Sequence, residues 1–170
     1  RMRGQAFLIR YADDAVILFE REDDAKRVYA ALPKRFERFG LHIHPDKTRL
    51  VHFERPRGGG ALPSGPGKSR SFDFLGFTHV WGKSRLGRPT VQRTTMKSRF
   101  SRAVKAIATW LRRNLHAPLA IQAKQIAAKL RGHDAYYGIT GNAPALALLR
   151  CAILRVWWRV VHSVYRSAKL

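Results

Sequence analysis

The most distinctive chemical feature of the sequence is a pair of adjacent aspartates, Asp13 and Asp14, which begins two residues after Tyr11. Short apolar runs flank it at residues 6–9 and 15–19, and their length and composition predict two strands. A hairpin with the pair at its turn brings two carboxylates to one point outside the sheet. Carboxylate oxygens and substrate phosphates together bind magnesium, and two such ions can support in-line phosphoryl transfer. Asp-Asp is also an ordinary turn dipeptide, but the tyrosine and both strands exceed what a turn requires.

The charge of the chain predicts a polyanionic partner. The formal net charge is +22 over 170 residues. Residues 1–54 hold nine acids against eleven Lys and Arg, whereas residues 55–170 hold two acids against 22. Such a basic stretch is an electrostatic footprint for phosphates. A membrane surface is the alternative, but no lipidation signal and no apolar run of about 18 residues accompanies the charge. We therefore expect nucleic acid as the partner, and no membrane.

The single cysteine, Cys151, allows no internal disulfide and cannot build a zinc site alone. Its place in an apolar helical run predicts a small core residue. This cysteine content fits a reducing compartment, so we expect a cytoplasmic protein.

The elements around the aspartates are predicted from periodicity. Residues 23–39 are expected to form a helix capped by Asp23 and stopped at Gly40, with Pro33 causing a kink or an early break. Its apolar stripe consists of Ala25, Val28, Leu32, Phe36 and Phe39. Two short extended pieces are expected within residues 41–53, around a turn at 45–48. A glycine- and proline-rich loop follows at about 56–69.

The second half of the chain is expected to begin with another hairpin and to continue as helices. The hairpin pairs residues 72–80 with 89–94. Helices are predicted at 96–115, from Pro118 to about residue 131, and from Asn142 onward. Their apolar positions are Phe100, Val104, Ile107, Trp110 and Leu111, then Leu119, Ile121, Ile126 and Leu130, then Leu146, Leu149, Ile153, Val156, Trp157, Val160 and Val164. The expected fold class is α+β: a small antiparallel sheet with one helix in residues 1–94, followed by a three-helix bundle in residues 95–170.

Four segments, taken in order, resemble reverse transcriptases of the group II intron type. Tyr11-Ala12-Asp13-Asp14 between apolar strands is similar to the catalytic hairpin of the polymerase palm. Residues 40–48 (GLHIHPDKT) resemble the segment in which a lysine approaches the nucleotide. Residues 72–77 (FDFLGF) resemble the primer-grip strand. Arg131-Gly132-His133, Tyr136-Tyr137-Gly138 and Gly141-Asn142 resemble the maturase, or thumb, segment. The resemblance covers roughly residues 5–165.

The resemblance implies an RNA-directed DNA polymerase that uses Mg²⁺ and binds structured intron RNA, a template, a DNA primer and dNTP. It also implies a partial palm at residues 1–94 and a thumb at residues 95–170, acting in intron splicing and mobility. A non-catalytic RNA-binding, maturase-like module from a truncated enzyme is the alternative function. Retron and CRISPR-associated enzymes are alternative lineages, and the maturase-like segment argues more against the retrons.

The resemblance also implies roles at the palm. Asp13 and Asp14 would be catalytic metal ligands, and Tyr11 would lie near the primer terminus. Lys47 would lie near the phosphates of the nucleotide, to neutralise charge or to donate a proton to the leaving pyrophosphate. An ordinary surface lysine is the alternative. His42 and His44 alternate on an expected strand, but no third ligand supports a metal site.

Phe74, Leu75 and Gly76 would position the primer end. Gly76 lacks a Cβ, so a nucleic-acid backbone could approach it closely. The alternative for the phenylalanines of this segment is an ordinary strand core.

In the thumb, the RNA-binding residues implied are Arg131, Tyr136, Tyr137, Arg112 and Arg113. Tyrosines can stack on splayed bases and arginines can hold phosphates. Packing of the two tyrosines between helices is the alternative.

The two-metal site of such a palm is expected to be incomplete in these 170 residues. The family carries a further aspartate and the fingers upstream of the hairpin, and none of the ten residues before Tyr11 is acidic. We therefore expect the chain by itself to be inactive in DNA synthesis.

Overall fold

The structure is a computed structural model that describes residues 2–56 and 71–167. The chain divides into two compact units, Arg1–Leu75 and Gly76–Leu170. The predicted palm–thumb boundary, after residue 94, lies further along the chain than this division. Each unit is described by itself.

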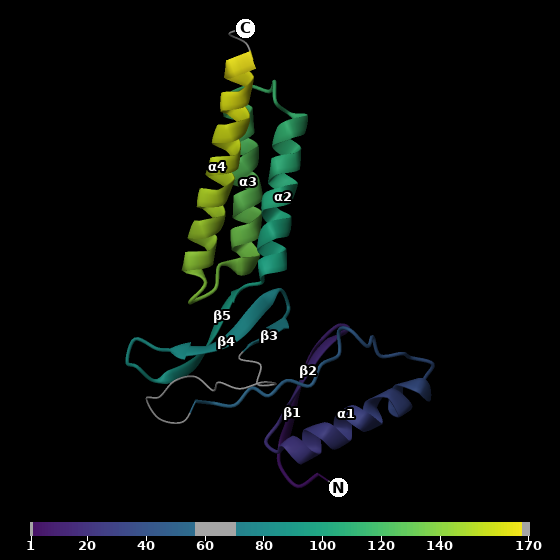
Figure 1. The fold of residues 1–170 in the computed structure, drawn as a ribbon. Coiled ribbons are helices and arrows are strands. Elements are labelled where there is room, and N and C mark those ends of the chain that lie inside the picture. Colours follow the sequence, from purple (N-terminus) through teal and green to yellow (C-terminus); the bar gives the residue numbers. More distant parts are fainter. Residues whose placement is uncertain (1, 57–70, 168–170) are drawn as a thin grey trace. The chain divides into compact units, whose positions relative to one another are not determined.

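The first unit begins with a β-hairpin. Strands β1 (Ala6–Tyr11) and β2 (Asp14–Phe19) pair antiparallel, in a register that runs from Ala6 opposite Phe19 to Tyr11 opposite Asp14. Helix α1 (Glu22–Glu37) follows the hairpin directly (Figure 1). The predicted hairpin with the acidic pair at its turn is confirmed.

Helix α1 differs from its prediction at both ends. It begins at Glu22 after Arg21, which makes no side-chain capping bond, so the prediction of Asp23 as cap was wrong. The helix continues through Pro33 to Glu37, so the early break expected at this proline does not occur.

The apolar stripe of α1 is buried only in its first half. Ala25 is buried and Val28 and Leu32 are half-buried, whereas Phe36 and Phe39 are 38% and 66% exposed.

Residues 41–56 form no strand, which corrects the expected extended pieces and the strand assigned to the two histidines. Their regular feature is a turn at residues 45–47, where the N–H groups of Lys47 and Thr48 both donate to the carbonyl of His44. The hydroxyl of Tyr29 on α1 donates to the carbonyl of Thr48 at 3.3 Å, so the loop is fastened to the helix. The predicted loop at 56–69 lies almost wholly outside the described residues. Strand β3 (Ser71–Phe74) closes the first unit.

The second unit begins at a tight turn. Leu75 and Gly76 have positive φ values of 49° and 79°, so the single strand predicted over residues 72–80 is interrupted there. Strands β4 (Phe77–Lys83) and β5 (Pro89–Thr95) then form the second hairpin, with Phe77 opposite Thr95 and Lys83 opposite Pro89.

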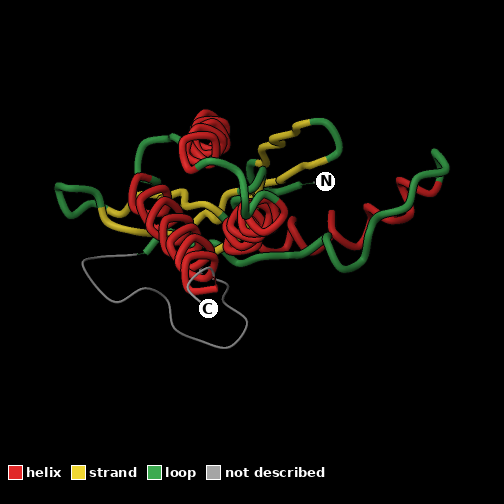
Figure 2. The backbone as a smooth tube through the Cα atoms, turned by 90° about the horizontal axis from the view of Figure 1, so that it is seen from above, coloured by secondary structure: helices red, strands yellow, loops and turns green. Residues whose placement is uncertain are grey.

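Three helices follow: α2 (Lys97–Arg113), α3 (Leu119–Tyr137) and α4 (Ala143–Ser167). They run side by side in Figure 1, and Figure 2 looks down on the same bundle. The buried centre consists of Ile107, Leu111, Ile126, Leu149 and Ile153, with Phe100, Val104, Trp110, Leu130, Val156, Trp157 and Val160 packed around it. The α+β class and the three-helix bundle are therefore confirmed.

Details of the bundle differ from the prediction. Helix α3 continues beyond residue 131, because Gly132 lowers the helix propensity without ending the helix. Leu119 and Ile121 are 45% and 51% exposed, and Gln122 is buried in their place. Cys151 is exposed rather than in the core. The side chain of Val164 lies outside the described residues. Among the described helices, none combines the length and hydropathy of a membrane-spanning segment.

Candidate functional site

The turn of the first hairpin is a two-residue loop made by Ala12 and Asp13, since Tyr11 and Asp14 are the last paired residues. Ala12 has a φ of 49°, the left-handed conformation that such tight hairpin loops require at their first position. A side chain there costs about 1–2 kcal/mol. The Arg10 Nε donates to the Ala12 carbonyl at 2.9 Å and braces the loop. Arg10 had no role in the predicted site.

Both aspartates are exposed, as is Tyr11, which is 67% accessible. Tyr11 and Asp14 are directly opposed across the hairpin, so their side chains lie on one face. Within residues 2–56 and 71–167, the side chains of Asp13 and Asp14 make no hydrogen bond and no ion pair. Their oxygens are therefore available to an external cation.

The donor chemistry of this turn fits part of a Mg²⁺ site. Two carboxylates are hard oxygen donors, and Mg²⁺ usually binds to one or two carboxylates with the rest of its coordination from water and phosphate. Among the described residues, no group of three or more His, Cys, Asp or Glu is placed to hold a metal.

Lys47 lies exposed in the turn at residues 45–47. No hydrogen bond or ion pair joins its side chain to Asp13 or Asp14 in the described parts of the chain. The predicted role of Lys47 at the nucleotide stays a prediction.

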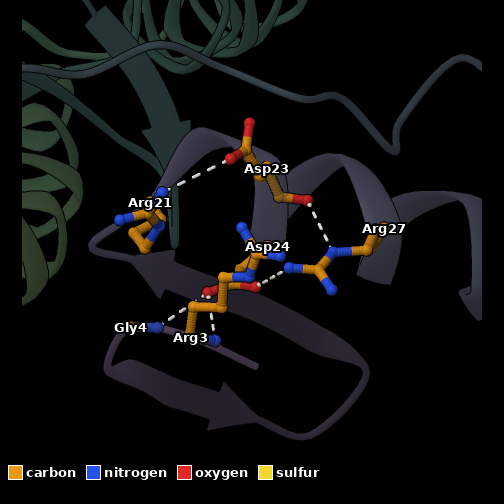
Figure 3. Close-up of polar contacts among 6 residues, drawn as sticks. All are labelled: Arg3, Gly4, Arg21, Asp23, Asp24 and Arg27. Carbon is orange, nitrogen blue, oxygen red and sulfur yellow. Dashed lines mark hydrogen bonds and ion pairs between the residues drawn. The ribbon is translucent and has the colours of Figure 1, made fainter. Parts of the chain in front are cut away.

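A second acid of the first unit, Asp24, is almost completely buried, at 2% exposure. Its Oδ2 accepts the backbone N–H groups of Arg3 at 2.9 Å and Gly4 at 2.8 Å, and its Oδ1 accepts from Arg27 at 2.6 Å (Figure 3). The N–H of Gly4, followed by that of Arg3 and by the charge of Arg27, holds the pKa of Asp24 below its usual value, against the effect of burial.

Asp24 therefore ties the segment before β1 to the first turn of α1, and so positions the hairpin that carries the acidic turn. Sequence reasoning missed it. The available signal was three acids at the start of the helix, Glu22-Asp23-Asp24, but nothing local distinguishes the buried one.

The predicted primer-contact segment is half-buried at Phe74 and Leu75 and buried at Gly76. Its neighbour Phe72 packs edge to face on Phe53, with ring centroids 4.9 Å apart, so the strand-core alternative holds for this phenylalanine. A Cβ added at Gly76 would lie 2.8 Å from the Tyr137 hydroxyl. Tyr137 occupies the space beside the glycine on this side, and contact of Gly76 with the primer stays a prediction.

The maturase-like segment contributes an aromatic cluster. Tyr137 contacts Phe77 at 5.2 Å, Tyr136 at 4.8 Å and His133 at 4.4 Å between ring centroids. Tyr137 thus packs α3 against strand β4. Tyr136 also stacks on Phe77 at 5.9 Å, but it is 55% exposed. Stacking of RNA bases on Tyr136 stays a prediction.

Asn142 is completely buried just before α4. It stands at the predicted cap position, where its backbone carbonyl accepts the N–H groups of Ala145 and Leu146. Its side chain bonds elsewhere: the Oδ1 accepts the N–H of Thr95 at 2.9 Å, and the Nδ2 donates to the Thr95 hydroxyl and the Tyr137 carbonyl, each at 2.8 Å. The side chain therefore joins the end of β5 to the end of α3.

The second unit is strongly basic. Residues 76–167 contain seventeen Lys and Arg and one acid, Asp134, which pairs with Arg150 at 2.6 Å. The predicted RNA-binding Arg112, Arg113 and Arg131 are exposed, and within the described residues their side chains make no hydrogen bond or ion pair. Helix α2 exposes the largest set: Lys97, Arg99, Arg102, Lys105, Arg112 and Arg113.

Residues 1–79 match the family described as "Reverse transcriptase (RNA-dependent DNA polymerase)". The reverse transcriptase match includes the acidic turn, Asp24, Lys47 and the residues from Phe74 to Gly76. It ends within β4. No curated protein and no solved structure matches the chain.

The reverse transcriptase match supports the polymerase resemblance over the first 79 residues. The maturase-like segment and most of the basic surface lie beyond it, so a group II intron origin rests on the sequence resemblance.

Proposed function

We propose that this chain is a portion of an RNA-directed DNA polymerase, a reverse transcriptase of the group II intron type. The observation that carries the proposal is the exposed turn with two adjacent, unpaired carboxylates inside the reverse transcriptase match. The Arg10 Nε, which donates to the Ala12 carbonyl, braces the turn that presents these carboxylates.

The chemistry proposed for this turn is nucleotidyl transfer. Asp13 and Asp14 would hold Mg²⁺, which when bound activates a primer 3′-hydroxyl and neutralises the nucleotide phosphates. Tyr11 lies on the face of Asp14 and would contact the primer terminus. Lys47 would add positive charge near the phosphates of the incoming dNTP. Phe74, Leu75 and Gly76 would contact the primer strand.

The proposed role of the helical bundle is to bind the template–primer duplex and intron RNA. The supporting observation is the positive charge of residues 76–167. Their one acid, Asp134, is paired with Arg150. An A-form duplex is recognised mainly through phosphates and shape, which exposed bases on helices suit. The group II assignment is supported by the order of the four motifs and by the maturase-like segment.

A second candidate is a non-catalytic RNA-binding module that assists splicing. The observation that favours it is that the basic surface is concentrated in the part of the chain beyond the reverse transcriptase match. Both candidates require RNA binding, and they differ in whether the acidic turn takes part in chemistry.

The decisive experiment is a gel-shift comparison of a group II intron RNA with an unrelated structured RNA of equal length, measured across salt concentrations. The proposal expects tighter binding of the intron RNA at every salt concentration. Equal affinity would contradict an intron-specific role and leave generic basic binding.

Primer extension separates the chemistry from binding. We expect the 170 residues alone to bind a primed RNA template without extending it, because Asp13 and Asp14 supply only part of the ligands that two magnesium ions need. Robust Mg²⁺-dependent synthesis by this chain would contradict the incomplete site.

A further inference from the structure

The turn at Gly76 is held by contacts from the helical part of its own unit. The Gly76 carbonyl accepts the N–H of Met96 at 3.0 Å, at the point where β5 ends and α2 begins. On the other side, the Tyr137 hydroxyl fills the space where a Cβ would stand. Gly76 itself has a φ of 79°, which glycine adopts freely but does not enforce. The conformation of the turn therefore depends on its neighbours.

Tyr137 is in turn fixed by the rest of the maturase-like segment. Its ring is stacked on His133 and lies against Phe77. Its carbonyl accepts from Asn142, and Asn142 holds the N–H and the hydroxyl of Thr95. Thr95 directly precedes Met96, whose N–H donates to the Gly76 carbonyl. The contacts therefore form a closed path from Gly76 to Tyr137, on to Asn142, and through Thr95 and Met96 back to Gly76.

We propose that Tyr137 and Asn142 are positioning residues for the turn at Gly76, which sets where a primer end can lie. The inference rests on the proposed function, in which residues 74–76 contact the primer. It assigns the maturase-like segment a second task besides binding RNA. Tyr136 is 55% exposed, whereas Tyr137 and the completely buried Asn142 act through the turn.

A double-mutant cycle tests the contact without any nucleic acid. Gly76→Ala places a Cβ against the Tyr137 hydroxyl and also strains the positive φ, whereas Tyr137→Phe removes the hydroxyl alone. We expect Gly76→Ala to lower the urea midpoint less in the Tyr137→Phe background than in the natural chain. Tyr136→Phe is the matched control and should leave the Gly76→Ala effect unchanged. If the two changes lower the urea midpoint additively, the inferred contact between Gly76 and Tyr137 is wrong.

Photocrosslinking tests the positioning role in the full chain. The probe is an RNA template annealed to a DNA primer that ends in 4-thiothymidine, and the readout is crosslink yield at residues 71–77 per bound complex. Tyr137→Phe and Thr95→Val should lower this yield by about tenfold, since small misplacements act strongly on close contacts. Duplex affinity, carried by the exposed bases, should change less than about twofold. Thr95→Ser keeps the hydroxyl and should restore the yield.

The possible failures of this experiment are distinct. If the natural chain binds the duplex without crosslinking at residues 71–77, the primer-contact part of the proposed function is wrong and the positioning inference falls with it. If the natural chain crosslinks there and both variants keep the same yield per complex, the proposed function stands and the positioning inference is wrong. A parallel loss of affinity and yield would also overturn it, since general unfolding would explain both.

Discussion

Aspartates have two different structural roles in this chain. Asp13-Asp14 and Asp23-Asp24 are both adjacent acidic pairs, but only the first lies between two runs that predict strands. In the structure, the first pair stands exposed on a hairpin turn, available to a cation. Asp24 is buried with two backbone N–H groups and Arg27 as partners. The strands flanking the first pair predicted its place, whereas the partners of Asp24 become visible only when residues 3 and 24 meet.

His133 gives a pH prediction at this scale. Neither ring nitrogen has a partner in the described residues, and burial lowers the pKa of His133 below 6.5, with the carboxylate of Asp134 opposing part of the effect. The unfolded chain therefore binds this proton more readily than the folded chain. Its contribution to stability is complete above pH 6.5 and is lost as the pH falls toward the lower folded pKa.

The measurement is urea unfolding followed by tryptophan fluorescence at about pH 7.5 and about pH 5.5, on either side of the ordinary histidine pKa. His133→Phe keeps an aromatic ring on Tyr137 and should reduce the loss of stability at the lower pH. The exposed His116, changed to Gln, serves as the control and should leave the loss as it is. An unchanged loss in His133→Phe would contradict the assignment.

At the scale of elements, the apolar periodicity correctly predicted helix α3 but placed Leu119 and Ile121 on its buried face, where Gln122 lies instead. Gln122 is 1% exposed, and its Nε2 donates to the carbonyls of Asn114, Leu115 and Ala117, where α2 has ended. Its Oε1 accepts the indole N–H of Trp157 at 2.8 Å. A polar residue is buried here because its amide bonds to carbonyls of the loop between α2 and α3 and to the Trp157 indole.

Gln122→Ala is therefore expected to destabilise the bundle by about 2–3 kcal/mol, since it leaves the Trp157 indole and several carbonyls without partners. Gln125→Ala, at an exposed position of the same helix, is the matched control and should stay within about 0.5 kcal/mol of the natural chain. The measurement is the free energy of unfolding in urea. Equal effects of the two changes would show that the network around Gln122 contributes nothing.

At the scale of the whole molecule, the acidic turn and most of the basic residues lie in different parts of the chain. The first 54 residues are nearly balanced and contain the acidic turn, whereas the rest of the chain is strongly basic. Attraction to phosphates through counterion release depends on the number of contacting bases and weakens with salt. Affinity for nucleic acid and placement of its reacting end are thus expected to be separable properties.

The prediction is that Arg112→Gln together with Arg113→Gln makes the salt dependence of duplex binding shallower, by about 1–2 in the slope of log affinity against log salt. The control is Lys34→Gln together with Arg38→Gln on and beside α1, which removes the same charge from the first unit. Fluorescence anisotropy with a labelled RNA–DNA hybrid gives both slopes. Equal slopes for the two double variants would place the binding surface elsewhere.

The sequence by itself determined the α+β class, the first hairpin with its acidic turn, the three helices and the basic second half. These follow from local periodicity, turn chemistry and composition, which neighbouring residues carry. Only the tertiary structure decided that Asp24 and Gln122 are buried, that Pro33 leaves its helix intact, and that Tyr137 fills the space at Gly76. The bonds between Thr95 and Asn142 join residues 47 apart in the chain. Such partners leave no local pattern, because each becomes favourable only after packing has brought the other polar group to it.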